Sequence, residues 1–576
     1  MAQHSPSRAA HRLLSLDILL ALLALAGGLR VLFLAAPEPA WPAEAANVAH
    51  AYALAHLTSF TGTGGAGVSP FGWLQLSAWT MVTDASGRSA TALVAVRETM
   101  LAAGVAGVVL VWFLGRRLGL TRWAAAASAL LLAASPLALG LQRLVVVEHL
   151  AAVWVLGALV LITRPDARIR HDVVASGCLL AAVLTSPLAL FFLPVAGWLL
   201  VRRAPVRAAL VAVLLNLGLG IAFGPAAGAL RPHLALPGRP SLADWLALDP
   251  AWAVLAAVAL PAALAVTALR PFAVSGLLLA ATLLVPGVPA TAVLALLLPV
   301  TPLLVAGIVQ AVVRQRAPAH RVDTARPRRA GFAAALAAIT VASWGFAFPV
   351  LQPSADRAGP LTGAQEWLRA NASGARLLVD DAAWAELAHA GWPTGMLTSP
   401  AACAAGCPSA EWAVFTGDPA GPAPDGASAT AVFGTGGRRV TVWRLGLPPA
   451  DPAVPPEAPA RARAGASLLA SARITAAPDA AAVLREGRAD PRLIATLAAL
   501  AALQPVRIAA FPEVPGEDPA GQPRRRVLLT GEEDAATTFY TGQRALFRPS
   551  SVTRTDGGVL VTYPLFAPPG LLGPAS

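Results

Sequence analysis

Long apolar runs dominate the first 350 residues and alternate with short polar stretches. A helix of about 20 apolar residues can span the hydrocarbon core of a bilayer, so each such run predicts a membrane-spanning helix. The stretch 172–202 is divided at Ser186-Pro187, because proline lacks a backbone donor and keeps its predecessor out of the helical region. The pattern predicts eleven spans, at 13–36, 90–115, 122–140, 144–163, 172–186, 188–202, 205–224, 251–269, 271–287, 289–313 and 330–350.

The arginines between these runs predict the orientation of the chain. They gather at 116–117, 164–170, 202–207 and 314–329, and an excess of basic residues is typical of cytoplasmic loops. With a cytoplasmic N-terminus, eleven spans place all four clusters on the cytoplasmic side. A ten-span alternative, with 172–202 as one helix, would place 202–207 outside and is disfavoured. The loops 37–89 and 225–250 and everything after 351 are then expected outside the cytoplasm.

The pattern changes after residue 351 to that of soluble α/β structure. Residues 376–381 predict a strand, Trp384 to Ala390 a helix, and 411–416 and 429–433 further strands, with Gly436-Gly437 as a hairpin signal. Asp490-Pro491 predicts a helix start, with aspartate as the N-cap and proline at the first position. We therefore expect a transmembrane domain at 1–350, an α/β domain at 351–447, a Pro-rich linker at 448–459 and a second α/β unit at 460–576.

Composition narrows the class of protein. Of the 576 residues, 56% are hydrophobic and only 13% charged, and the mean hydropathy is +0.63. These values exclude disorder for most of the chain and argue against a soluble enzyme. A net charge of +12 would raise nucleic acid as a partner. Because the arginines lie between apolar runs, we interpret them as membrane-loop charges and expect no nucleic-acid partner.

Neither the cysteines nor the histidines predict a metal site, and no cofactor is expected. Cys178 lies in an apolar run, while Cys403 and Cys407 could form a short-loop disulfide in an oxidising compartment or remain free. No second cysteine pair completes a zinc site. The histidines lack metal-ligand spacing and are expected at the surface or the membrane interface, at His50, His56, His149 and His233.

Charged residues near the expected outer ends of the first spans are the candidate functional groups. A charge within a span is costly and usually indicates pairing or function. An interfacial anchor or a structural ion pair would explain any one of them. Since they share one membrane face, we expect the carboxylates and arginines to converge on an outward cavity, with Glu44, Arg143 and Glu148 at its centre and Arg97 close by. The candidates are Arg30, Glu44, Arg97, Arg143 and Glu148.

Two further motifs are weak. Residues 62–67 read GTGGAG and match G-x-G-x-x-G, but they follow no predicted strand, so a dinucleotide site is not expected. Asn371-Ala372-Ser373 matches an N-glycosylation acceptor, which matters only in a host that glycosylates this region.

The order of these features resembles the membrane glycosyltransferases that use a polyprenyl-phosphate sugar, the protein O-mannosyltransferase and aminoarabinose-transferase-like group with the GT-C fold. The resemblance covers residues 10–205, and the later spans only in topology. The residues that carry it are Arg30, Ala43-Glu44, the segment from Ser69 to Trp79, Arg97, Ser135-Pro136, Arg143 and Glu148. The chain departs from the family at Ala43, where members have an aspartate, at Ser69, where they have a histidine, and at Glu148, where they have an aspartate.

The resemblance implies an inverting hexosyltransferase-like enzyme that moves a sugar from a polyprenyl-phosphate carrier to an extracytoplasmic glycan or protein acceptor. Glu44 and Glu148 would be the catalytic carboxylates, with an external carboxylate as general base, and Arg143, Arg97 and Arg30 would bind substrate. The alternative is a non-catalytic relative that acts as an envelope scaffold or sugar-lipid binder. A transporter is less favoured, because the spans show no internal repeat.

Overall fold

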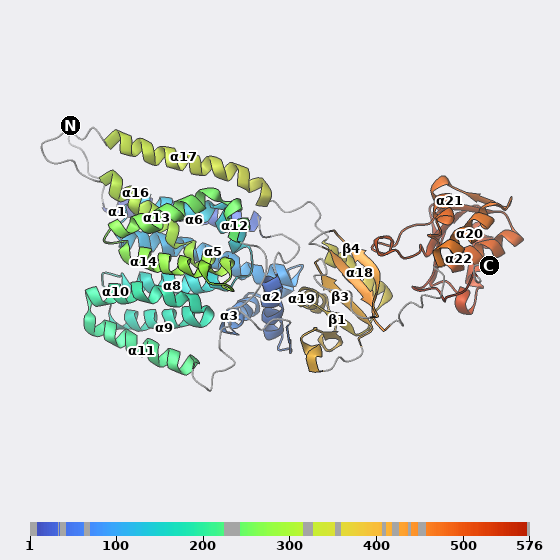
Figure 1. The fold of residues 1–576 in the computed structure, drawn as a ribbon, viewed down its shortest axis with the longest axis horizontal. Helices are drawn as coiled ribbons and strands as arrows, with labels where there is room; N and C mark the ends of the chain where they lie inside the picture. The colour runs from blue at the N-terminus through green and yellow to red at the C-terminus, as the bar shows by residue number, and fades with distance from the viewer. Residues whose placement is uncertain are drawn as a thin grey trace. The chain divides into compact units, whose positions relative to one another are not determined.

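The computed structural model divides the chain into two compact units, Met1–Arg357 and Ala358–Ser576. The first is built from helices, and the second combines helices with two β-sheets (Figure 1). The structure describes residues 8–32, 34, 42–62, 70–166, 168–223, 242–314, 326–351, 359–405, 410–417, 426–435, 439–446 and 457–572.

Each predicted span in the first unit coincides with one or two helices. Among the described residues, two helices are long and apolar enough to cross a membrane, within α1 (Arg8–Leu32) and α5 (Ala92–Arg117), and up to five spans result if each bent pair counts as one. The count of eleven therefore stays a prediction. The remaining helices from residue 122 to residue 351 are α6 (Arg122–Ala134), α7 (Pro136–Gln142), α8 (Glu148–Ile162), α9 (Ile169–Thr185), α10 (Leu193–Arg203), α11 (Pro205–Phe223), α12 (Leu242–Leu248), α13 (Pro250–Ala262), α14 (Arg270–Ala281), α15 (Ala290–Leu297), α16 (Val300–Arg314) and α17 (Arg326–Leu351).

Prolines account for the main breaks between these helices. The helix α9 ends at Thr185 and a 3-10 helix begins at Pro187, so the predicted interruption of the helix at Ser186-Pro187 is present. The pair α6 and α7 bends by 55° at Ser135-Pro136, and the pair α12 and α13 bends by 105° before Pro250. A proline cannot donate to the carbonyl four residues earlier, so the chain turns where the ladder is interrupted.

The segment 37–89, expected only as an external loop, contains three helices among its described residues. They are α2 (Pro42–Ala55), α3 (Pro70–Thr83) and the short α4 (Ala85–Arg88). The side chains of α2 from Ala43 to Ala49 are all buried. A helix with so little exposed surface is packed into the unit, so α2 belongs to its core rather than to a surface connection. The helix α3 buries one side, with Gly72, Leu76 and Thr80, and exposes Leu74 and Val82 on the other.

The second unit holds two five-stranded mixed sheets. The first has the order β2-β1-β3-β5-β4, in which β1 lies parallel to β2 and β3, and β5 lies antiparallel to β3 and β4. The predicted strands and hairpin pairing are present, although Gly436 and Gly437 lie outside the described residues. Its strands are β1 (Leu377–Val379), β2 (Leu397–Thr398), β3 (Trp412–Thr416), β4 (Ser428–Phe433) and β5 (Val440–Arg444), with helices α18 (Pro360–Asn371) and α19 (Asp381–His389).

The second sheet has the order β6-β7-β8-β10-β9. The predicted helix start at Asp490-Pro491 is confirmed, because the Asp490 carboxylate accepts a hydrogen bond from the Arg492 amide. Most of the expected linker lies outside the described residues, so that domain division stays a prediction. The elements are β6 (Ile474–Ala476), β7 (Val506–Ala510), β8 (Arg526–Thr530), β9 (Ser551–Thr555) and β10 (Gly558–Thr562), with α20 (Glu457–Leu469), α21 (Pro478–Arg485), α22 (Pro491–Leu503) and α23 (Glu533–Thr541).

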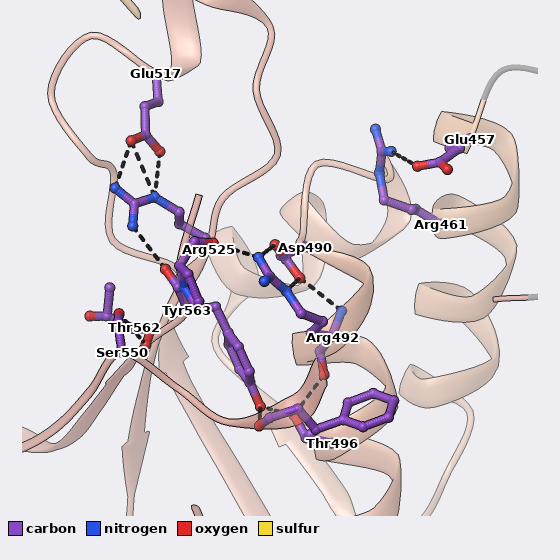
Figure 2. A network of polar contacts seen from close by, with 12 residues as sticks. Glu457, Arg461, Asp490, Arg492, Thr496, Glu517, Arg525, Ser550, Thr562 and Tyr563 are labelled. Atoms are coloured by element: carbon purple, nitrogen blue, oxygen red, sulfur yellow. Dashed lines mark hydrogen bonds and ion pairs between the residues drawn. The ribbon is translucent and has the colours of Figure 1, made fainter. Parts of the chain in front are cut away.

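A buried ion pair of the second unit, Glu517 with Arg525, lies at the centre of a network of polar contacts (Figure 2). Arg525 meets the Glu517 carboxylate at 2.8 and 2.9 Å and also donates to the Tyr563 carbonyl oxygen and the Asn371 side-chain oxygen. The Trp367 indole of α18 donates to the same Glu517 at 2.8 Å. Residues around the first sheet are thereby tied to a loop of the second half.

The cysteines, the GTGGAG segment and the glycosylation motif are only partly covered by the described residues. Cys403 is disulfide-bonded and Cys178 is free, while Cys407 lies outside the described residues. Most of the GTGGAG segment also lies outside them. The side chain of Asn371, the first residue of the glycosylation motif, donates to the Trp367 carbonyl oxygen and accepts from Arg525, so it is engaged within the unit.

Candidate functional site

The centre of the candidate site is the short segment 143–147, which is not helical and joins α7 to α8. The Arg143 amide still donates to the Leu139 carbonyl oxygen and the Val147 carbonyl oxygen accepts from the Ala151 amide, whereas side chains satisfy the buried backbone groups of Val145. The Val145 amide donates to the Glu44 carboxylate at 3.0 Å, and the Asn47 amide group donates to the Val145 carbonyl oxygen at 2.8 Å. Glu44 and Asn47 lie three residues apart on α2, on one helix face, so this face of α2 anchors the segment.

Glu44 forms a fully buried ion pair with Arg97 of α5. The Arg97 Nε lies 2.8 Å from Glu44 Oε1 and its Nη2 lies 2.9 Å from Oε2, and neither side chain has exposed surface. A bidentate arginine is the strongest single partner for a carboxylate in this setting. Because Oε1 also accepts from Val145, both oxygens of Glu44 are engaged. A base role for Glu44 would require this pair to open.

Arg30 of α1 has a capping role at the break between α6 and α7. Its guanidinium donates to the carbonyl oxygens of Leu132 and Ala133, both at 3.4 Å, and to the Gln142 side chain at 3.0 Å. Pro136 has no amide to offer Leu132, which leaves that carbonyl without its helical donor. A cation at a helix C-terminus is also favoured by the helix dipole. Arg30 therefore stabilises the bend.

A buried carboxylate that the sequence analysis did not select, Asp249, holds the other side of this bend. The Ser135 hydroxyl donates to Asp249 Oδ2 at 2.7 Å, and the Leu137 amide lies 3.5 Å from the same oxygen. Asp249 is also the N-cap of α13, accepting from the Trp252 amide at 2.9 Å. One carboxylate thus caps the N-termini of two helices, where negative charge is favoured.

Arg143 and Glu148 are placed differently from the other candidates. Arg143 is the C-cap residue of α7 and Glu148 is the first residue of α8, and both are only partly buried. The Ser186 hydroxyl lies 3.4 Å from Glu148 Oε1. The neighbouring His149 is 3% exposed, with Nε2 3.0 Å from the Leu141 carbonyl oxygen. The expectation of a surface or interfacial His149 was therefore wrong.

The helix α3 covers the same segment. Gly72 approaches Val147 so closely that a Cβ atom at residue 72 would lie 2.9 Å from a Val147 methyl carbon. The Trp73 indole donates to the Asn47 side-chain oxygen at 3.0 Å, and the Gln75 amide donates to the Thr185 hydroxyl at 2.7 Å. Both contacts lead back to partners of the segment, since Thr185 precedes Ser186. Helix α3, from the segment expected only as an external loop, therefore packs against the candidate site.

His50 of α2 stacks on Trp73 of α3. Its ring lies 3.6 Å from that of Trp73 at an interplanar angle of 13°, and its pKa is lowered to about 4 by burial. A histidine with this pKa is neutral at physiological pH. His50 therefore acts as an aromatic packing group rather than as a cation. Among the described residues, no cluster of histidine, cysteine and carboxylate side chains is suited to hold a metal ion.

The five candidate residues thus reach one segment by different routes. Arg30 contacts Gln142, which directly precedes the segment, and Glu44, paired with Arg97, contacts Val145 within it. Arg143 is the first residue of the segment, and Glu148 directly follows it. Sequence analysis missed Asn47, Gln142 and Asp249. The spacing of Asn47 from Glu44 could have suggested a shared helix face, but nothing in the sequence connects either to Val145, about a hundred residues later.

No family model and no curated protein matches the sequence of this chain. Solved structures similar to it include ArnT from Cupriavidus metallidurans bound to undecaprenyl phosphate, at 13% identity and a TM-score of 0.47, over 77% of this chain and 100% of that one. The apo state of the same protein gives 14% identity and a TM-score of 0.46, over 76% and 98%.

A second similar structure is the archaeal oligosaccharyltransferase AglB from Archaeoglobus fulgidus, in complex with an inhibitory peptide and a dolichol-phosphate. The identity is 13% and the TM-score 0.41, over 67% of this chain and 60% of AglB.

Proposed function

We propose that the chain is a membrane glycosyltransferase that moves a sugar from a polyprenyl-phosphate carrier to an extracytoplasmic acceptor. The observation that carries the proposal is the position of two partly exposed charged side chains at the two ends of the segment 143–147. Arg143 is its first residue and Glu148 directly follows it, and buried side-chain contacts to Val145 hold the segment between them. A cation for phosphate and a carboxylate for a hydroxyl are the two groups that such a transfer requires. The sequence resemblance described above favours the same chemistry.

In the proposed reaction, Glu148 is the general base. It takes the proton of the acceptor hydroxyl while that oxygen attacks the anomeric carbon, and the bond from this carbon to the carrier phosphate breaks with its electron pair leaving on the phosphate. Arg143 stabilises the negative charge of the departing phosphate. A single displacement inverts the anomeric configuration. Glu44, with both oxygens engaged, acts in this proposal as a positioning residue for the segment.

The test is transfer by the purified full chain in lipid nanodiscs, supplied with a polyprenyl-phosphate hexose and membrane-extracted acceptor glycans. We expect Glu148→Gln to lower turnover by about 10²- to 10⁴-fold, the range for a lost general base, while binding of polyprenyl phosphate persists. Arg143→Ala should weaken that binding by a free energy of about 1.5 to 3 kcal/mol. Unchanged turnover in Glu148→Gln would exclude Glu148 as the base.

The second candidate function, a non-catalytic sugar-lipid binder, is favoured by one observation. Glu44 is the carboxylate nearest to the family's aspartate position at Ala43. Both of its oxygens already accept hydrogen bonds, from Arg97 and from the Val145 amide. A binder would retain the carrier through Arg143 and show no turnover in the native chain. The same nanodisc measurements therefore separate the two functions, because only the transferase loses an activity when Glu148 is changed.

The orientation of the chain is part of the proposal, with the N-terminus cytoplasmic and the second unit extracytoplasmic. Labelling of intact cells with an impermeant thiol reagent tests it, in a chain carrying Cys178→Ser. We expect Ser373→Cys to be labelled and Arg170→Cys to be protected until the cells are opened. The reverse pattern would overturn the topology, and with it the external location of the site.

A further inference from the structure

A hollow of about 470 Å³ lies between α6, α13, α16 and α17. Its wall is formed mainly by aliphatic and aromatic side chains, among them Leu131, Val309 and Val341, with Trp344 from the second half of α17. None of its lining residues belongs to the segment 143–147 or to the residues that hold it. The hollow is therefore separate from the candidate transfer site.

An apolar space of this size calls for an apolar occupant. Water is poorly held where few polar groups line the wall, and an apolar cavity of about 150 Å³ already binds a ring as large as benzene. This hollow is about three times larger and falls within the range of roughly 300 to 1,000 Å³ that is typical of ligand sites. In a unit built of apolar helices, the abundant molecule of matching chemistry is a lipid chain.

Charged and aromatic residues lie at one end of the hollow. Arg314 at the end of α16 lines it and is exposed, and no described carboxylate forms an ion pair with it. Trp123 is 61% exposed, with the Arg122 guanidinium 5.7 Å from its ring centre. Tryptophan and arginine together are typical of the membrane interface. This end therefore lies at the level of the lipid headgroups, on the side predicted to be cytoplasmic.

The other polar groups at this end are already satisfied by the protein. The Thr121 amide donates to the Gln310 side-chain oxygen at 2.6 Å, and the Gln310 amide group donates to the Gly119 carbonyl oxygen at 3.1 Å. These bonds fix the loop between α5 and α6 against α16. Arg314 is left as the charged group that can meet an anion, since the neutral groups beside it are occupied.

We propose that this hollow binds one acyl chain of an anionic phospholipid from the facing leaflet, with the lipid phosphate at Arg314. The apolar wall holds the chain, and the guanidinium selects the headgroup through charge-assisted hydrogen bonds. A basic residue near a membrane surface is worth about 1 kcal/mol toward anionic lipid, which corresponds to about a fivefold preference. The site is independent of the proposed transferase, because it shares no residue with it.

The experiment uses the full chain in vesicles of equal parts phosphatidylcholine and phosphatidylglycerol, followed by gentle detergent release and native mass spectrometry. We expect one retained phospholipid per chain, with phosphatidylglycerol favoured about fivefold over phosphatidylcholine. Arg314→Gln should bring the two lipids close to parity while a lipid is still retained. Arg170→Gln, an exposed arginine that does not line the hollow, should leave the preference unchanged.

Two adjacent alanines of α17 provide the matched pair for occupancy. Ala337 lines the hollow and Ala338 does not, and both are exposed. Ala337→Trp should fill the space and abolish retention, whereas Ala338→Trp should retain the lipid. Equal retention in the two variants, or equal preference for the two lipids in the native chain, would overturn the proposal. Neither result depends on turnover, so failure of the transferase proposal would be visible separately.

Discussion

Both units of the molecule contain a buried arginine held by a glutamate, and the two pairs are built alike. In the first unit Arg97 meets Glu44 at 2.8 and 2.9 Å, and Glu44 also holds the Val145 amide. In the second unit Arg525 meets Glu517 at 2.8 and 2.9 Å, and Glu517 also holds the Trp367 indole. In both cases the glutamate also holds a group more than a hundred residues away in sequence.

The surroundings of the two pairs differ. Beside Glu517 and Arg525, the next ion pair, Asp490 with Arg492, is also buried, at 2% and 3% exposure, and Arg492 donates to the Pro564 carbonyl oxygen (Figure 2). Beside Glu44 and Arg97, the flanking Arg143 and Glu148 keep exposed surface. A buried ion pair by itself therefore indicates a structural role rather than a binding or catalytic one. The partly exposed charges that it positions are the ones that can meet a substrate.

The largest expected effect is that of Arg97→Met, which leaves the Glu44 carboxylate buried without its cation. Breaking one half of such a pair costs about 3 to 5 kcal/mol, to be measured as the free energy of unfolding of the full chain in detergent. The double variant Glu44→Gln with Arg97→Met should recover part of that loss, because no uncompensated charge remains. Native-like stability of Arg97→Met would show that the pair contributes little.

Arg525→Met tests whether the second pair is purely architectural. We expect a loss of about 3 kcal/mol by the same reasoning, seen as faster hydrogen exchange in α18 and in residues 511–526. Exchange at residues 142–148 and binding of polyprenyl phosphate should stay unchanged, whereas Arg97→Met should alter both. Weakened carrier binding in Arg525→Met would contradict the distinction drawn between the two pairs.

Gly516 tests how the loop that carries Glu517 is held. Its φ is +86°, its carbonyl oxygen accepts from the Val432 amide, and a Cβ atom there would lie 2.5 Å from the Phe433 ring. Gly516→Ala should therefore cost about 1 to 3 kcal/mol through overpacking, in addition to backbone strain. Gly521, with φ +75° and no neighbour within 4 Å of the added atom, is the control that meets backbone strain alone. Equal losses in a chemical denaturation series would exclude the contact with Phe433.

The smallest expected effect is confined to alkaline pH. Burial raises the pKa of Tyr540 and of Tyr563 above the ordinary tyrosine value, so the folded state keeps protons that the unfolded chain loses. Stability is thus complete below a pH of roughly 10 and falls above it, by about 1.4 kcal/mol per pH unit for each tyrosine. Tyr540→Phe should flatten this slope. Absorbance at 295 nm follows the ionisation, since the chain has only three tyrosines.

Much of the fold could be predicted from the sequence because its signals are local. Apolar runs and proline breaks marked the helices of the first unit, and the Asp490-Pro491 pair marked the start of α22 within one residue. The helices α2 and α3 were missed, since runs of fourteen residues with few charges are too short to count as spans. Their burial comes from packing in the unit, which no local pattern records.

The candidate site could be predicted only in part, for a related reason. Charged residues near span ends are visible in the sequence, so Glu44, Arg97 and Glu148 could be selected. Several contacts of the site join backbone groups or side chains about a hundred residues apart. Examples are Asn47 with the Val145 carbonyl oxygen and Arg30 with the Gln142 side chain. Asp249 directly precedes Pro250 and resembles an ordinary N-cap, so its second contact, with Ser135, has no signal in one sequence.

The angle of the bend at Ser135-Pro136 determines where the far end of α7 lies. The helix α7 beyond it has seven residues and is therefore about 10 Å long, so a change of roughly 10° in the bend would swing its far end by roughly 2 Å. Arg143 stands at that end. Displacements of about 1 Å can cost two orders of magnitude in rate when reacting groups must align. Arg30 and Asp249 need not touch a substrate. By holding the angle of the bend, they fix the position of Arg143, the residue proposed to bind the phosphate.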